Sequence, residues 1–170
     1  MDLKKIIRDI PDFPKEGIIF KDITTILNTP EALKFTIDSL VAHAAKHAVE
    51  VVVAAESRGF IFGMPVACAL GIPFVPIRKP GKLPAKTYSA SYELEYGVDS
   101  LEIHCDAFDK GKKVLIIDDL LATGGTTGAM IELVNKVGGE VCAIAYVIEL
   151  EFLNGRQKIG AYDVFSLVKY

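Results

Sequence analysis

Short apolar runs alternate with helical patterns along most of this chain, and this alternation constrains the fold more than any other feature. The apolar runs lie at 50–54, 73–77, 114–117 and 140–148, and the first and last of them open on Glu50 and Glu140. Apolar residues recur at helical spacing over about 30–47, 64–70 and 126–137. Strands that are apolar on both faces and separated by helices are typical of a parallel sheet covered on each side. The pattern predicts an α/β fold with a central, mostly parallel sheet of about five strands flanked by helices.

Prolines set the limits of two predicted helices. Residues 2–9 mix charged and apolar side chains and predict a short amphipathic helix that stops at Pro11. Pro65 fits only the first turn of a helix, because it has no backbone N–H to donate. The helix at 64–70 is therefore expected to begin just before it.

One long segment, 79–106, breaks the alternation with Gly, Pro and polar residues. Period-two patterns inside it predict a β-ribbon at 87–94 and 100–104. A long irregular insertion in a compact domain is typically a functional flap. After the last helical pattern, 162–168 alternates as a final edge strand would.

Length and composition predict one globular, cytoplasmic domain over 1–170. The chain is 51% hydrophobic and carries a net charge of −3, which disfavours nonspecific binding to nucleic acid. Its three cysteines include no CxxC pair, as expected in a reducing cytosol. The N-terminus lacks the apolar core of a signal peptide, and no stretch approaches the ~18 uncharged apolar residues of a membrane span. No membrane partner is expected.

The strongest chemical signal follows the apolar run at 114–117. Asp118 and Asp119 are adjacent, and a loop of small residues at 122–126 leads into the predicted helix. Such a loop can turn backbone N–H groups and hydroxyls toward a phosphate at a helix N-terminus. The loop has no Lys for a Walker motif and does not match GxGxxG. With two acids beside it, the loop indicates a phosphorylated sugar; the alternative is a Gly/Thr turn with acids that cap the helix.

Basic residues follow two other predicted strands. Arg58 follows the run at 50–54, and Arg78, Lys79 and Lys82 follow the run at 73–77. Guanidinium groups pair with phosphate oxygens, whereas Lys acts as a point charge. These residues are candidates for a diphosphate, although Arg78–Lys82 could instead be a solvated basic loop.

Together these motifs resemble the type I phosphoribosyltransferases. The form Asp-Asp-Leu-Leu-Ala-Thr-Gly-Gly-Thr at 118–126 is similar to that of members that use adenine. Further matching segments follow in the family's order, at 11–14 with 17–24, at 56–60, at 78–84 and at 91–97. Lys21 stands where some relatives carry Arg. The resemblance implies the fold of that family, with a hood over about 1–25 and a flexible flap over about 79–106.

The resemblance also implies an activity in purine salvage. The 5-phosphoribosyl group of phosphoribosyl pyrophosphate would pass to adenine, giving AMP and pyrophosphate. Mg²⁺ would be held mainly by the substrate rather than directly by protein ligands, and the protein would be a homodimer. The residues that would hold the 5′-phosphate are Ala122, Thr123, Gly124, Gly125 and Thr126, while Asp118 and Asp119 would hold the ribose hydroxyls and stabilise charge at the anomeric carbon.

Two further groups of residues are implied by the resemblance. Pyrophosphate would be bound by Ser57, Arg58, Arg78, Lys79 and Lys82, with Arg58 also counted as catalytic. In the family the peptide that corresponds to Glu56–Ser57 is often cis. Adenine would be recognised by backbone groups of Ile19 and Lys21, with Ile19 and Leu120 against its faces.

Two flap residues complete the implied site. Glu95 would relay the proton of the base as general acid/base, and Tyr96 would cap the site during closure. For Glu95 the alternative is a plain surface charge.

Three other interpretations remain open from the sequence. The chain could be a regulatory module that senses ligands without turnover, or it could act on xanthine or another base. His43 and His47 lie one helical turn apart and could bind a metal, but the sequence shows no third ligand nearby and no HExxH pattern. They are expected on a solvated helix face, and His104 on a strand surface.

Overall fold

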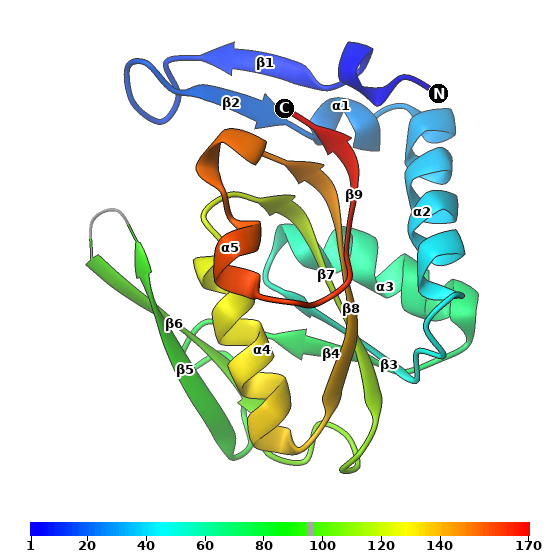
Figure 1. Cartoon of the computed structure of the whole chain (residues 1–170), viewed down its shortest axis with the longest axis vertical. Helices are drawn as coiled ribbons and strands as arrows, with labels where there is room; N and C mark the ends of the chain where they lie inside the picture. The colour runs from blue at the N-terminus through cyan, green and yellow to red at the C-terminus, as the bar shows by residue number, and fades with distance from the viewer. Residues whose placement is uncertain (95–96) are drawn as a thin grey trace.

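A central parallel sheet organises the molecule (Figure 1). The structure, a computed structural model, describes residues 1–94 and 97–170. In these residues the sheet has five strands, which lie in the order β4 (Phe74–Ile77), β3 (Val51–Ala55), β7 (Lys113–Leu121), β8 (Glu140–Glu149) and β9 (Val164–Lys169). All four neighbouring pairs are parallel. The predicted α/β fold is confirmed, and β9 is the predicted edge strand.

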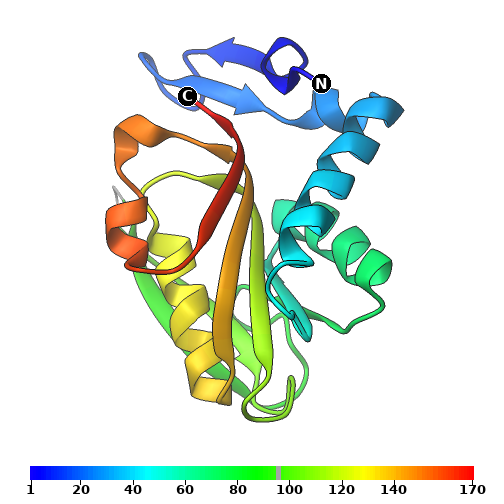
Figure 2. The same ribbon diagram turned by 45° about the vertical axis from the view of Figure 1, so that its right-hand side comes forward.

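Helices cover both faces of this sheet. The helix α4 (Gly125–Val137) packs on one face, while α2 (Pro30–Ala44) and α3 (Arg58–Leu70) pack on the other (Figure 2). Both faces of the central strands are buried this way, which suits the apolar residues of β3 and the run Val114–Ile117 of β7. All strands end at the same edge, so the loops after β3 and β7 are brought together there.

The position predicted for Pro65 is wrong. The helix α3 begins at Arg58, so Pro65 lies inside it rather than in its first turn. A proline there removes the hydrogen bond that would run to the carbonyl of Ile61. Ile61 is on the exposed side of α3, where water can reach the backbone. The helix therefore tolerates the proline and extends back to the carboxyl edge of the sheet.

The predicted helix at 2–9 is also wrong. A short 3₁₀ turn η1 (Leu3–Lys5) leads into β1 (Arg8–Pro11), which pairs antiparallel with β2 (Ile19–Asp22). Arg8 donates to the carboxylate of Asp22 across this hairpin, and a short helix α1 (Thr24–Leu27) follows. Pairing with β2 satisfies the backbone better than one helical turn would. The hairpin forms the expected hood above the carboxyl edge of the sheet (Figure 1).

The flap segment forms the predicted antiparallel ribbon. It consists of β5 (Thr87–Leu94) and β6 (Gly97–His104), and the second strand begins three residues earlier than expected. Ala90, Leu101 and Ile103 are buried in the same apolar cluster as α4. The ribbon is therefore packed on the core, and Tyr92, toward its tip, lies beside Gly125 at the phosphate loop.

The solvated environment predicted for His43 and His47 is wrong. His43 is only 8% exposed, and its ring stacks on Phe165 with centroids 4.7 Å apart. Burial, followed by the charge of His47, lowers the pKa of His43 below its usual 6.5. A third polar group is also present, because Asp163 Oδ2 lies 3.0 Å from His47 Nε2.

A connection that the sequence did not predict joins β8 to β9. It contains the 3₁₀ turn η2 (Glu151–Leu153) and the short helix α5 (Arg156–Ile159), which lies beside the start of α4 (Figure 1). Arg156 donates two hydrogen bonds to the buried carboxylate of Glu149, at 2.6 and 2.7 Å. This pair fixes α5 against the end of β8. None of the helices in the described ranges is long and apolar enough to cross a membrane.

A buried hydrogen bond joins the first turn of α4 to β8. The hydroxyls of Thr127 and Tyr146 are 2.5 Å apart, and both side chains are buried. Burial raises the pKa of Tyr146, so its hydroxyl stays protonated. Tyr146→Phe is expected to lower the free energy of unfolding by about 1–2 kcal/mol, because Thr127 loses its buried partner. Urea denaturation measures this, and Tyr88→Phe at a more exposed position should leave the midpoint unchanged; an equal shift in both variants would contradict the assignment.

Candidate active site

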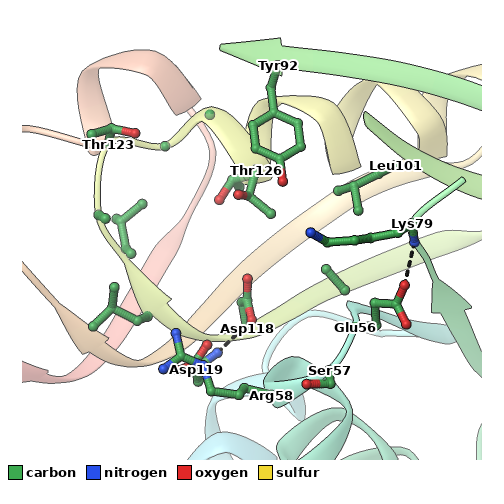
Figure 3. A pocket seen from close by; sticks show the side chains of 17 residues that line it. Glu56, Ser57, Arg58, Lys79, Tyr92, Leu101, Asp118, Asp119, Thr123 and Thr126 are labelled. Carbon is green, nitrogen blue, oxygen red and sulfur yellow. Dashed lines mark hydrogen bonds and ion pairs between the residues drawn. The ribbon is translucent and has the colours of Figure 1, made fainter. Parts of the chain in front are cut away.

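A cavity of about 360 Å³ opens at the carboxyl ends of β3 and β7. This is the edge at which parallel α/β sheets bind ligands. Figure 3 shows its side chains, which come from β3, the start of α3, the loop after β4, the ribbon, the end of β7 and the loop before α4. The lining residues are Ala55, Glu56, Ser57, Arg58, Lys79, Tyr92, Leu101, Asp118, Asp119, Leu120, Leu121, Ala122, Thr123, Gly124, Gly125, Thr126 and Thr127.

The predicted phosphate loop lies on one wall of this cavity. Its residues 122–126 all line the cavity and lead directly into the N-terminus of α4. Gly124 has a φ of +82°, a left-handed conformation that favours glycine. An added Cβ there would also lie 2.5 Å from the carbonyl oxygen of Gly155. The loop is thus held by the backbone before α5, and its N–H groups sit at a helix N-terminus that favours an anion.

The two acids stand at the end of β7 on the floor of the cavity. Asp118 Oδ1 accepts a hydrogen bond from the backbone N–H of Asp119 at 2.9 Å. Arg58 Nε lies 3.0 Å from Asp119 Oδ2, although this buried oxygen has no aligned hydrogen-bond donor among the described residues. Gly59 allows the approach of α3, because an added Cβ would lie 2.9 Å from Asp118 Oδ1. The start of α3 and the end of β7 therefore form one tightly packed unit.

Burying the two adjacent carboxylates of Asp118 and Asp119 costs free energy unless a ligand compensates for their charge. Burial first, and then the charge of Asp119, raise the pKa of Asp118 well above its usual 3.8. Burial also raises the pKa of Asp119, and the Arg58 guanidinium opposes that rise. Two buried carboxylates side by side favour ligands that bring hydroxyl donors or positive charge. Ribose hydroxyls and an anomeric cation have that character.

The predicted pyrophosphate residues do not all reach the cavity. Ser57, Arg58 and Lys79 line it, and the Glu56–Ser57 peptide that begins α3 is cis. Arg78 lies just outside the lining and donates to Glu56 Oε2 from Nε at 3.1 Å and Nη2 at 2.8 Å. Arg78 also donates weakly to the carbonyl of Lys82, which is not part of the lining.

Sequence reasoning missed six lining residues, namely Ala55, Glu56, Tyr92, Leu101, Leu121 and Thr127. Glu56 accepts hydrogen bonds from Arg78 and from the backbone N–H of Lys79, the latter at 2.6 Å. Burial raises its pKa, but these bonds outweigh burial, and the pKa lies below its usual 4.5. The sequence feature that could have identified Glu56 as a site residue is its position directly after a predicted buried strand. Tyr92 extends from the ribbon toward Thr126 of the phosphate loop (Figure 3). Its hydroxyl donates a hydrogen bond to Asp99 Oδ2 at 3.3 Å.

Glu56 positions the basic loop, and its removal gives a direct test. Glu56→Ala is expected to raise the KM for a diphosphate-bearing substrate about tenfold and to change kcat less, because Lys79 and Arg78 lose a shared anchor. Steady-state kinetics measure both constants. Glu132→Ala is the control, since Glu132 pairs with Lys136 on α4 and neither lines the cavity nor contacts the basic loop. An unchanged KM in Glu56→Ala would show that Glu56 does not position this loop.

The structure separates the residues predicted for adenine. Leu120 lines the cavity at the sheet edge, whereas Ile19 and Lys21 line a second cavity of about 360 Å³. That cavity lies between the hood and the C-terminal segment, against Phe152 and Tyr170. The two groups are therefore not brought into one pocket here.

Backbone recognition by the hood remains compatible with this geometry. The ammonium of Lys21 lies 2.7 Å from Asp9 and 3.8 Å from the centroid of the Tyr170 ring, so its side chain is engaged. Pro11 stands opposite Ile19 in the hairpin and has no N–H to donate to the Ile19 carbonyl.

Glu95 and Tyr96 lie outside the described residues, so their roles stay predictions.

A parallel sheet with a phosphate loop and an acid pair at its carboxyl edge defines a phosphoribosyl-binding α/β domain. Comparison of this sequence with known protein families supports the assignment to a phosphoribosyl-binding domain. The sequence profile of the phosphoribosyl transferase domain family matches residues 22–169.

Full-length relatives narrow the class further. The adenine phosphoribosyltransferase of Clostridium novyi is 60% identical over 170 residues, covering 100% of this chain and 99% of the relative. The crystal structure of adenine phosphoribosyltransferase from Thermoanaerobacter pseudethanolicus is 53% identical with a TM-score of 0.96, covering 99% and 98% of the two chains. The Saccharomyces cerevisiae enzyme, solved with an imino-altritol bisphosphate and adenine, is 41% identical with a TM-score of 0.94, covering 98% and 96%. The chain belongs to the phosphoribosyltransferase family, in its adenine phosphoribosyltransferase branch.

Proposed function

We propose that this chain transfers the 5-phosphoribosyl group of phosphoribosyl pyrophosphate to adenine in purine salvage, releasing AMP and pyrophosphate. The observation that carries the proposal is the cavity itself. It places a phosphate loop, a buried acid pair and the cations Arg58 and Lys79 on facing walls of one space. Relatives more than half identical over their full length are named for this activity.

The cavity walls suit the two ends of the sugar phosphate. The amides and hydroxyls at 122–126 would hold the 5′-phosphate at the N-terminus of α4. Asp118 and Asp119 would accept hydrogen bonds from the ribose hydroxyls. As the bond from the anomeric carbon to pyrophosphate breaks, positive charge develops on the ring beside these carboxylates. The acids thus stabilise the transition state more than the ground state.

The leaving pyrophosphate would meet Ser57, Arg58 and Lys79 on the opposite wall. Arg78 and Lys82 would join them once Arg78 exchanges Glu56 for a phosphate oxygen. The site also fits Mg²⁺, because the acid pair supplies hard oxygen donors and Asp119 Oδ2 has no hydrogen-bond donor within the described chain. We propose that Mg²⁺ is held mainly by the oxygens of the substrate and neutralises charge on the leaving group.

Adenine would enter between Leu120 and the hood. Backbone groups of Ile19 and Lys21 would pair with N1 and the exocyclic amine, a pattern that 6-oxopurines reverse. A buried mismatch leaves groups unpaired at about 1–3 kcal/mol each, which favours adenine. As N9 bonds the anomeric carbon, the imidazole proton of the base must leave, and Glu95 is proposed to accept it.

Glu95→Gln is expected to lower the rate of the chemical step by about 10²-fold, because an amide cannot take the proton. The affinity for phosphoribosyl pyrophosphate should stay nearly intact. Single-turnover kinetics and equilibrium titration measure the two quantities separately. A collapse in affinity with an unchanged chemical step would mean that Glu95 positions the flap instead.

We further propose a cytoplasmic homodimer. Ile61 and Met64 are 37% and 49% exposed on the outer side of α3, a helix that begins in the active site. A second copy that covers this side would lie close to Arg58. The three cysteines are unpaired in the described chain, as suits a reducing compartment. Light scattering of Ile61→Lys with Met64→Lys against the parent tests the interface, and a dimer that persists would place it elsewhere.

The activity is tested by incubating the protein with phosphoribosyl pyrophosphate and adenine, hypoxanthine, guanine or xanthine in turn, with and without Mg²⁺. The expected result is AMP from adenine, dependent on Mg²⁺, with little product from the 6-oxopurines. Turnover of xanthine in preference to adenine would overturn the base assignment. Ligand binding with no turnover of any base would instead support a regulatory module.

A further inference from the structure

A second cluster of ligand-type side chains lies away from the active site, where α2 ends. One ring nitrogen each of His43 and His47 and a carboxylate oxygen of Asp163 lie within 4.8 Å of one another. His47 Nε2 is already 3.0 Å from Asp163 Oδ2. The two histidines come from the last turn of α2 and the residues just after it, and Asp163 directly precedes β9.

Local backbone structure fixes the three side chains in this arrangement. The chain forms a turn after α2, in which the N–H of His47 donates to the Ala44 carbonyl at 3.0 Å. This turn brings the two imidazoles to 4.7 Å between centroids. On the other side, the Asp163 carbonyl accepts a hydrogen bond from the N–H of Ile144 in β8 at 2.9 Å. Phe165 stacks flat on His43 with an interplanar angle of 13°, which limits rotation of the ring.

The environment of His43 indicates that a partner is missing from its hydrogen-bonding scheme. His43 is more than nine-tenths buried, and its Nε2 makes no hydrogen bond with any described residue. Buried polar side-chain atoms are nearly always satisfied in native proteins. A metal ion beside this pair of histidines would also exploit the carboxylate, which is otherwise half exposed at 57%.

We propose that His43, His47 and Asp163 bind a Zn²⁺ ion, with water in the fourth position. Imidazole nitrogen and carboxylate oxygen bind Zn²⁺ at about 2.0–2.2 Å in tetrahedral geometry, which sets ligand atoms about 3.3 Å apart. The 3.0 Å pair already has nearly that spacing, and the widest pair must close by at most about 1.5 Å from the 4.8 Å limit, which a shift of the more exposed His47 and Asp163 side chains would supply. The charged neighbour Lys46 opposes binding but lies on the exposed side of the turn.

The position of the cluster assigns it a structural role. His47 lies shortly before β3 and Asp163 just before β9, so the ion would sit toward the amino ends of the strands, whereas the cavity lies at their carboxyl ends. Zinc would join the end of α2 to the edge strand β9 and stabilise the fold. This site stands independently of the proposed transferase activity.

The test uses the whole protein, freed of metal by chelator and dialysis. Zn²⁺ is titrated against a chromogenic chelator, and thermal unfolding is followed with and without Zn²⁺. The parent should bind Zn²⁺ at this site and show a higher Tm with it. Asp163→Ala and His47→Ala should each weaken that binding at least about tenfold and abolish the Tm rise. His104→Ala, which removes a histidine outside the cluster, should retain both.

The metal-free Tm of each variant shows whether it is folded, and Asp163→Ala is expected to fold because its side chain is half exposed. Unchanged Zn²⁺ affinity in both cluster variants would place the ion elsewhere, on the acid pair or a cysteine, and overturn the proposal. A parent protein with no Zn²⁺-dependent change in Tm would overturn it as well.

Discussion

Asp118→Asn is expected to lower kcat by about 10²–10³-fold while raising the free energy of unfolding. The amide is nearly isosteric, and its oxygen can still accept the N–H of Asp119 that Asp118 Oδ1 accepts now. The lost charge removes the stabilisation of the anomeric cation, which accounts for the fall in kcat. The gain in stability, about 1 kcal/mol at pH 7, comes from removing one of two buried like charges.

The sign of the stability change follows from the pKa of Asp118, which burial and Asp119 raise above 3.8. A carboxyl with a raised pKa in the folded state destabilises that state as pH rises through 3.8 and above. Urea denaturation between pH 4 and pH 8 should therefore show a smaller loss of stability in Asp118→Asn than in the parent. Asp38→Asn on the exposed face of α2 is the control and should change neither kcat nor this slope. A kcat within about twofold of the parent for Asp118→Asn would remove Asp118 from the mechanism.

Gly155→Ala is expected to reduce kcat/KM for phosphoribosyl pyrophosphate about 10²-fold, although Gly155 is remote in sequence from the phosphate loop. Its φ of −56° suits alanine, so the backbone itself is not strained. The added Cβ would overlap the carbonyl oxygen of Ala122 and lie 2.9 Å from Leu121 Cδ1. A backbone carbonyl cannot rotate away as a side chain can, so the phosphate loop must shift. A displacement near 1 Å in such a site costs rates of this order.

Overpacking at Gly155 should also lower the free energy of unfolding by about 1–3 kcal/mol. Gly128→Ala is the matched control, because Gly128 lies in the first turns of α4 and an added Cβ there meets no atom of the described residues within 4 Å. It should retain kcat/KM and gain about 0.5–1 kcal/mol of helix stability. Steady-state kinetics with urea denaturation separate the two variants. Equal kcat/KM for both would mean that Gly155 does not hold the phosphate loop.

Much of the fold was predictable because its signals are local. The buried runs that became β3, β7 and β8 are apolar on both faces, and this alone predicts a parallel sheet. The phosphate loop was predictable for a related reason, since a Gly/Thr loop between a buried strand and a helix has few other uses. The family resemblance then implied roles that no spacing could show, such as those proposed for Ile19 and Lys21.

The parallel sheet, the predicted phosphate loop and the acid pair near the end of β7 follow from the order of residues alone, because neighbouring residues carry each of these patterns. Three contacts come only from packing in the folded protein: Glu56 with Arg78, Gly155 with Ala122, and Asp163 with two histidines. The failed helix at 2–9 belongs to the same group, since β2 supplied its partner. These contacts join segments that are far apart in sequence. Packing of the whole chain brings them together, so no local pattern of residues predicts them.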